Sequence, residues 1–182
     1  MNAAVPYRSS APRVLGTLAI VFGALDVAAE LVNLFRVLAA QDRATMELLG
    51  GIGVEMTAVA PAYAGRAVVM LAMSVTLIVL GAGLRTMREP YRLAAVYWSE
   101  GAVAVLVGRV VLWEAVIWPH LDRARSITAL GFHWFPPLED LVGSFLQLAR
   151  FGEYAIVVLL LPFPVVLLAV LGMKRVRASM SP

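Results

Sequence analysis

The chain contains no cysteine among its 182 residues and only two histidines. The absence of cysteine excludes disulfide bonds, thiolate metal sites, iron–sulfur clusters and thiol nucleophiles. The spacing between His120 and His133 matches no metal-ligand motif, so we interpret both as surface residues and expect no metal or other cofactor. No serine has a histidine and an acid at a spacing typical of hydrolases. The glycine-rich stretch 50–53 lacks the strand and the lysine of a phosphate loop.

Charge is also scarce. Charged residues make up 15% of the chain and hydrophobic residues 61%, whereas soluble domains carry about 25% charged residues. A net charge of +3 and a pI near 9.7 would suit a nucleic-acid-binding protein if the arginines gathered on one face of a folded domain. They stand instead at the ends of long apolar runs, where basic residues indicate the orientation of a membrane protein. We therefore expect no nucleic-acid partner.

Long apolar runs fill most of the sequence, at about residues 14–38, 67–84, 93–118 and 154–173. Each meets or nearly meets the ~20 residues that a helix needs to cross a bilayer. They predict an all-α fold, a polytopic membrane protein whose bundle of four transmembrane helices forms one membrane domain over residues 1–182. Outer connections are expected at 39–66 and 119–153, and an inner connection at 85–92.

The first apolar run could also be part of a secretory signal peptide. Arg8 and Arg13 precede it, and Val27-Ala28-Ala29 has the small residues of a cleavage site. The run continues through Leu38, however, well past the about 7–15 residues of a signal's apolar core. We therefore interpret it as a transmembrane span.

Basic residues predict the orientation. Those in short flanks of transmembrane helices stay on the cytoplasmic side, so both termini should be cytoplasmic. Usage rich in Ala, Val, Leu and Arg is typical of bacteria, which favours the bacterial inner membrane. The flanking basic residues are Arg8, Arg13, Arg85, Arg88, Arg92, Lys174, Arg175 and Arg177.

The second outer connection has helical periodicity, with Leu141, Phe145 and Leu148 on one side. We interpret residues 138–150 as an amphipathic helix on the outer surface, one of one or two such surface helices. The alternative is that these residues extend the fourth transmembrane helix, which requires that no break occurs at Gly152.

A weak repeat relates the two halves of the chain. Residues 46–51 resemble residues 138–143, and Tyr63-Ala64 and Tyr154-Ala155 each precede a Leu-Gly pair and basic residues over the same separation. Tandem duplication of a two-span unit would produce parallel repeats of this kind. Apolar segments also match by chance, so the sequence leaves both explanations open.

Polar residues interrupt the first apolar run along one helical stripe. Asp26, Glu30 and Asn33 follow one another at spacings of four and three. Ala19 and Gly23 continue the stripe, and small residues at this spacing let another helix approach closely. An ionisable side chain near the middle of a span costs about 2.5–3.5 kcal/mol or more, so the stripe should face protein or trapped water.

The third apolar run has a similar stripe, lined by Glu100, Ala104, Gly108 and Glu114. Arg109 lies about 100° from Gly108 and therefore off this stripe. Glu30 and Arg109 should lie at matched depth, where an ion pair would lower the cost of burying each charge. If the helices met squarely through Gly108, Arg109 would not reach Glu30, and the sequence does not resolve this conflict.

These polar residues have two interpretations. The first is a polar lock, a set of paired or protonated groups that fixes how the helices pack. The second is a proton or cation relay, because the acids outnumber Arg109 and one carboxyl group could exchange a proton. We favour the lock, because small helical membrane proteins need polar contacts between helices more often than they transport ions.

The fourth apolar run contains two prolines, Pro162 and Pro164, near its middle. Proline has no N–H and clashes with the preceding turn, so we expect a kink there. The carbonyl groups released by the kink could bond to hydroxyls of a neighbouring helix, such as those of Ser74 or Thr76. The alternative is that the kink is a functional hinge or that its carbonyl groups bind a cation.

The sequence therefore favours a non-enzymatic integral membrane protein, a subunit or scaffold of a membrane protein complex. Its expected partners are the lipid bilayer and other membrane proteins or a second copy of itself. The alternative is a small proton- or cation-coupled transporter that uses Asp26 and Glu30, with Arg109 as countercharge. A membrane enzyme or redox subunit would need cofactor ligands that the sequence does not locate.

Overall fold

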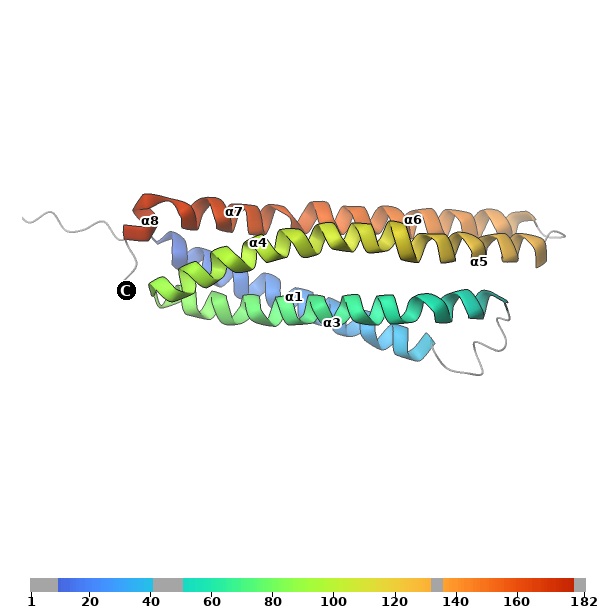
Figure 1. The fold of residues 1–182 in the computed structure, drawn as a ribbon, viewed down its shortest axis with the longest axis horizontal. Coiled ribbons are helices and arrows are strands. Elements are labelled where there is room, and N and C mark those ends of the chain that lie inside the picture. The colour runs from blue at the N-terminus through green and yellow to red at the C-terminus, as the bar shows by residue number, and fades with distance from the viewer. Residues whose placement is uncertain (1–9, 41–50, 132–135, 179–182) are drawn as a thin grey trace, which may run out of the picture. The chain divides into compact units, whose positions relative to one another are not determined.

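The protein is all-α. A computed structural model describes residues 10–40, 51–131 and 136–178, and these residues contain no β-strand (Figure 1). The elements in chain order are α1 (Ala11–Ala40), α3 (Gly51–Arg85), α4 (Glu89–Leu112), the π-helix η1 (Trp113–Ile117), α5 (Trp118–Gly131), α6 (Pro136–Leu160), α7 (Pro162–Gly172) and α8 (Lys174–Ala178). This confirms the fold class predicted from the apolar runs.

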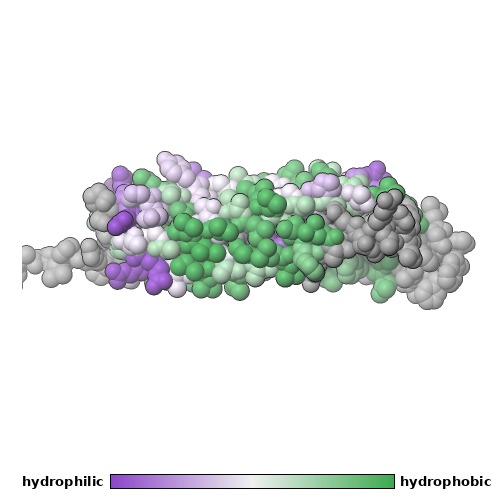
Figure 2. Space-filling model, turned by 90° about the horizontal axis from the view of Figure 1, so that it is seen from below, coloured by the Kyte–Doolittle hydropathy of each residue, from purple (hydrophilic) through white to green (hydrophobic). Residues whose placement is uncertain are grey.

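Four helical stretches are long and apolar enough to cross a membrane: Ala11–Phe35, Gly53–Arg85, Glu89–Ile127 and Asp140–Gly172. Only 17% of the most apolar part is buried in the first and fourth of them, so most of their side chains need an apolar solvent or a partner. Apolar residues also cover a broad area of the face drawn in Figure 2. These features indicate a membrane protein.

Two helices extend well beyond the apolar runs. The helix α3 begins at Gly51, and α6 is continuous from Pro136 to Leu160 without a break at Gly152. Residues 138–150 therefore form the first part of α6, which is the alternative to a separate surface helix. Leucine and glutamine sustain a helix well, and one glycine costs only about 1 kcal/mol. The connection at 41–50, with most of the repeat segment 46–51, lies outside the described residues.

The chain divides into two compact units, each described separately below. Unit 1 comprises the described parts of Met1–Ala28, Met70–Ala104 and Leu161–Pro182. Its apolar core joins α1, α3, α4, α7 and α8, with Ala19, Leu84 and Leu171 almost completely buried. Between α3 and α4 the chain reverses through Met87, whose φ of 61° is in the left-handed region common at helix ends.

Small residues bring α1 and α3 together within unit 1. A Cβ atom at Gly16 would lie 2.5 Å from the carbonyl oxygen of Gly81, and one at Gly81 would lie 2.6 Å from that of Gly16. A Cβ atom at Gly23 would lie 2.8 Å from the carbonyl oxygen of Ser74. The two backbones approach this closely because no side chain separates them at these positions.

Unit 2 comprises the described parts of Ala29–Val69 and Val105–Leu160. Its core gathers Trp113, Ile117, Leu121 and Leu146, and Tyr63 packs edge-on against Trp113 with the ring centroids 6.1 Å apart. The π-helix ends at Ile117, two residues before Pro119, and the Trp118 N–H donates to the carbonyl of Trp113, five residues back. Because proline in a helix crowds the carbonyl four residues earlier, widening the preceding turn accommodates it.

The helix along the fourth apolar run is interrupted at Leu161. The helix α6 ends at Leu160, and α7 begins at Pro162, with Pro164 buried in its first turn. The hydroxyls of Ser74 and Thr76 donate to carbonyls of their own helix, those of Met70 and Ala72. Those hydroxyls therefore do not satisfy the carbonyl groups at the interruption.

Candidate functional site

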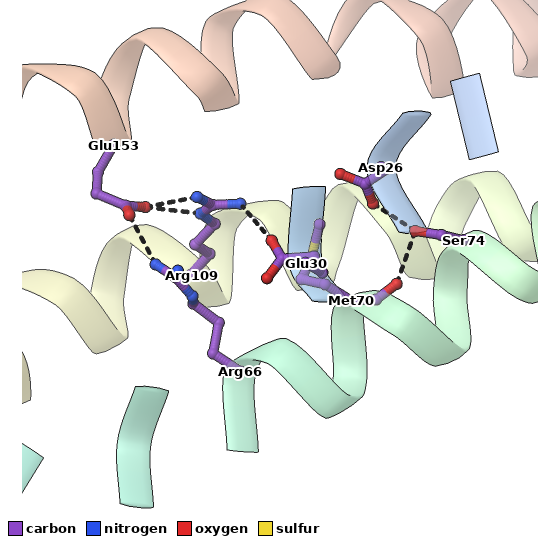
Figure 3. A network of polar contacts seen from close by, with 7 residues as sticks. All are labelled: Asp26, Glu30, Arg66, Met70, Ser74, Arg109 and Glu153. Carbon is purple, nitrogen blue, oxygen red and sulfur yellow. Dashed lines mark hydrogen bonds and ion pairs between the residues drawn. The ribbon is translucent and has the colours of Figure 1, made fainter. Parts of the chain in front are cut away.

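Four charged side chains, one from each of four helices, form a connected network within unit 2 (Figure 3). We call them the Glu153 network: Glu30 of α1, Arg66 of α3, Arg109 of α4 and Glu153 of α6. Nε and Nη2 of Arg109 lie 2.8 and 2.7 Å from Oε2 of Glu153, and Nη1 of Arg66 donates to Oε1 at 2.7 Å. On its other side, Nη1 of Arg109 lies 3.8 Å from Oε1 of Glu30.

The Glu153 network is buried and electrically balanced. The side chains of Glu30 and Arg109 are each 3% exposed, and those of Arg66 and Glu153 are 8% and 15% exposed. Two carboxylates face two guanidinium groups, so their formal charges sum to zero. Pairing of this kind offsets the cost of removing each charge from water, and loss of any one partner would leave a buried charge uncompensated.

The aromatic ring of Tyr63 contacts Arg66. The Cζ atom of Arg66 lies 5.2 Å from the centroid of the Tyr63 ring, a cation–π distance. Tyr63 in turn packs on Trp113, which follows Arg109 by one helical turn. The core of unit 2 therefore restricts both arginines to the positions from which they reach Glu153.

A second ion pair in unit 2 joins η1 to α6. Nε and Nη2 of Arg150 donate to the two carboxylate oxygens of Glu114 at 2.9 and 2.7 Å. The Tyr154 hydroxyl donates to the same carboxylate, and the guanidinium of Arg150 stacks 4.5 Å from the centroid of the Trp118 ring. This two-pronged pairing fixes the angle between the side chains, so we interpret it as a structural contact.

A third polar cluster joins α3 to α5 within unit 2. His120 Nδ1 lies 2.6 Å from Oε2 of Glu55, and Arg123 Nε lies 3.5 Å from the same oxygen. The other histidine, His133, lies outside the described residues. Within residues 10–40, 51–131 and 136–178, no group of three or more acidic, histidine or cysteine side chains could hold a metal ion.

Asp26 lies in unit 1 and has a different environment. It is half-buried, and its carboxyl group is hydrogen-bonded to the Ser74 hydroxyl, which also bonds to the Met70 carbonyl at 2.7 Å (Figure 3). A hydroxyl has one proton and can donate only one of these bonds. Among the described residues, no arginine or lysine forms an ion pair with Asp26.

The structure brings together some of the site residues predicted from the sequence and separates others. Glu30 and Arg109 face one another, whereas Glu114 pairs with Arg150 and Asp26 with Ser74. Of the packing residues, Ala19 and Gly23 are buried, and Ala104 and Gly108 are exposed. Glu100 is exposed and Asn33 half-buried. Arg109 reaches Glu30 because the stripe that contains Gly108 is not the side of α4 that packs.

Two residues of the Glu153 network, Arg66 and Glu153, were not predicted from the sequence, and Ser74 was expected to bond to carbonyls at the proline kink and not to Asp26. The predicted second and fourth spans began at residues 67 and 154, one position beyond Arg66 and Glu153. A span that is predicted from its apolar residues ends where a charged residue occurs, so the charged residue is assigned to the connection. The signal that could have found them is helical continuity, since α3 and α6 both extend through these charges.

Comparisons with known protein families, with curated proteins and with solved structures found no match for this chain.

Proposed function

We propose that the protein is a non-enzymatic subunit or scaffold of a membrane protein complex, in which the Glu153 network fixes its own helices and apolar helix faces bind partners. The observation that carries this proposal is the charge balance of the network, where Glu153 contacts two arginines and Arg109 contacts two acids. A relay would need a carboxyl group without a fixed countercharge, and Glu153 has two. The network therefore suits a polar lock.

The partner surface is proposed on the exposed apolar faces of α1 and α6. Phe35 and Leu25 of α1 are 72% and 64% exposed, and Phe151 and Leu159 of α6 are 70% and 77% exposed. Lipid chains adapt to any apolar helix surface, so lipid contact alone does not require particular side chains. Large aromatic side chains such as these are enriched where proteins contact one another. We propose another membrane protein or a second copy of this chain as the partner.

The proposed location is the bacterial inner membrane with both termini cytoplasmic. The orientation rests on the arginine and lysine residues in the short connection 85–92 and in the flanks of the first and fourth spans, and the bacterial membrane rests on the Ala-, Val-, Leu- and Arg-rich usage.

Native co-purification tests the scaffold proposal. The full chain would be extracted in a mild detergent, and the mass of the purified particle measured by light scattering. A stoichiometric companion or a defined oligomer is the expected result. Replacing Phe35 and Leu25 by alanine should release the partner, whereas the matched change of Val75 and Val79 on α3 should retain it. A strictly monomeric particle without a companion would contradict the proposal.

The alternative function, a proton- or cation-coupled transporter, is favoured by one observation, the Asp26–Ser74 contact. Asp26 is half-buried within a membrane-capable stretch, and among the described residues no arginine or lysine forms an ion pair with it. Purified protein in liposomes would show uptake driven by a pH gradient if Asp26 carries protons. Loss of that uptake in Asp26→Asn, but not in Glu100→Gln, would replace the scaffold proposal with the transporter.

A further inference from the structure

Basic side chains converge at one end of unit 1. One apolar core cluster lies there and joins five helices. Its residues include Ala11 at the start of α1, Leu84 at the end of α3, Ala95 near the start of α4, Leu171 at the end of α7 and Val176 of α8. Five exposed cations surround this end: Arg13, Arg85, Arg88, Lys174 and Arg177. We call them the basic rim.

Individual contacts place the rim residues near one another. The Cγ atom of Arg85 would lie 3.0 Å from a Cβ at Gly16, so the stem of Arg85 packs on α1 one turn after Arg13. On α8, Val176 is 4% exposed and packs into the core cluster. Burial of Val176 directs Lys174 and Arg177 outward, and both are exposed. The five cations therefore form one surface although they come from distant parts of the sequence.

An acid, Glu89, lies close enough to Arg177 of the basic rim to interact with it electrostatically, but its ion pair is with Arg92. Glu89 lies at the start of α4, but its two oxygens already accept bonds from Arg92 at 2.8 and 2.5 Å. Arg92 is buried and also donates to the carbonyl of Leu171 at 3.0 Å, so it serves as a structural tie between α4 and α7. Among the described residues, none of the five rim cations forms an ion pair within 4 Å.

The rim also lies where phospholipid headgroups would be. The four membrane-capable stretches begin or end in this region, at Ala11, Arg85, Glu89 and Gly172. Side chains at the ends of spans lie at the level of the headgroups. Arginine binds phosphate oxygens through two parallel bonds, and clusters of basic residues at the ends of transmembrane helices attract anionic lipids.

We propose that the basic rim binds the phosphate headgroup of an anionic phospholipid. Orientation during insertion also uses such cations, but it requires only their charge at the time of synthesis. If the rim is a binding site, the folded protein should also retain anionic lipid after purification and should prefer it to zwitterionic lipid.

Native mass spectrometry of the detergent-purified full chain tests this proposal. The protein would be titrated with phosphatidylglycerol or with phosphatidylcholine of the same acyl chains. We expect the wild type to retain phosphatidylglycerol preferentially. Each rim cation adds about 1 kcal/mol of attraction, so R85Q/R88Q should weaken phosphatidylglycerol binding by about 30-fold. K174Q/R177Q removes the same charge at the end of the chain and should act alike. The matched control R123Q/R125Q removes two cations from α5 and should keep the preference.

Three results would overturn the proposal. The first is equal retention of both lipids by the wild type, and the second is unchanged binding in both rim variants. The third is an equal loss in R123Q/R125Q, which would mean that net charge alone attracts the lipid. Thermal unfolding with phosphatidylglycerol, with phosphatidylcholine and with inorganic phosphate provides a second measurement. Only phosphatidylglycerol should raise the midpoint, and an equal rise with phosphate would identify a free-anion site instead.

Discussion

Glu153 has a position that no other acid in the described chain shares, because each of its carboxylate oxygens contacts a different arginine. The two arginines come from α3 and α4, so Glu153 joins both helices to α6 within unit 2. Removing the Glu153 carboxylate would leave Glu30 as the one acid of the network facing two guanidinium groups, so one buried positive charge would be uncompensated.

The substitution Glu153→Gln should therefore lower the free energy of unfolding by about 3–5 kcal/mol, the usual cost of breaking a buried ion pair from one side. Unfolding by sodium dodecyl sulfate in mixed detergent micelles measures this quantity. Glu100→Gln makes the same chemical change at an exposed position of α4 and should shift stability by no more than about 0.5 kcal/mol. Equal effects of the two substitutions would mean that the Glu153 network contributes nothing to stability.

Ser74 is the second residue whose substitution should strongly affect stability. Its hydroxyl is the hydrogen-bond partner of the Asp26 carboxyl group. We expect Ser74→Ala to cost about 1–3 kcal/mol in the same unfolding measurement, because it leaves a half-buried polar group unsatisfied. Thr76→Ala provides the control, since the Thr76 hydroxyl is exposed and bonds only to the carbonyl of Ala72 in its own helix. A loss in Thr76→Ala as large as that in Ser74→Ala would argue against the Asp26 contact.

Sequence reasoning at this scale identified one half of the Glu153 network. It placed Glu30 and Arg109 at the same depth from the helical rise alone, and the structure places the two charges 3.8 Å apart. It could not supply Arg66 and Glu153, because hydropathy treats a charge as the end of a span whether or not the helix continues. It also could not choose a partner for Glu114, since Arg150 becomes its neighbour only when α6 packs beside η1.

At the scale of elements, glycine determines how closely α1 and α3 approach in unit 1. The sequence predicted a small-residue stripe through Ala19 and Gly23, and Gly23 lies close to the backbone of α3. Gly16 and Gly81 make the tighter contact but were not singled out. Their role becomes visible only when both helices are present, because neither residue has a distinctive local pattern.

We expect Gly81→Leu to destabilise the protein by about 3 kcal/mol or more, because its side chain would overlap the Gly16 carbonyl and the side chain of Ala19. Gly65→Leu is a matched control in the same helix, since a Cβ atom at Gly65 would meet nothing within 4 Å. There leucine should be neutral or stabilising by up to about 1 kcal/mol through its helix propensity. Unfolding in mixed micelles distinguishes the two outcomes, and similar losses at both positions would refute the close approach.

The prediction of a separate surface helix at residues 138–150 was wrong, because α6 is continuous through them. A polar face on residues 138–150 is typical of a surface helix, but the structure continues these residues into α6. The polar face is explained by its contacts, since Arg150 pairs with Glu114 and Gly143 packs against the guanidinium of Arg125. The π-helix was likewise absent from the prediction, although Pro119 directly after Trp118 provides a physical reason for it.

At the scale of the whole molecule, the apolar runs indicate a membrane protein, because four helical stretches of the described residues are long and apolar enough to cross a bilayer. Orientation stays a prediction. It depends on the cations at the ends of the helices, and no contact within the protein distinguishes one orientation from the other. Labelling of the folded protein in its membrane is required.

The cysteine-free chain makes that measurement direct. Single cysteines would replace Arg88, Lys174 and Ser126, all of which are exposed. With both termini cytoplasmic, an impermeant thiol reagent should label Ser126→Cys in intact cells, and should label the other two only after permeabilisation. Labelling of Arg88→Cys and Lys174→Cys from outside would reverse the orientation but keep the four spans. Two membrane-capable stretches lie between Arg88 and Lys174, so both residues should be on the same side of the membrane. Labelling of Arg88→Cys and Lys174→Cys from opposite sides would therefore contradict the four-span topology.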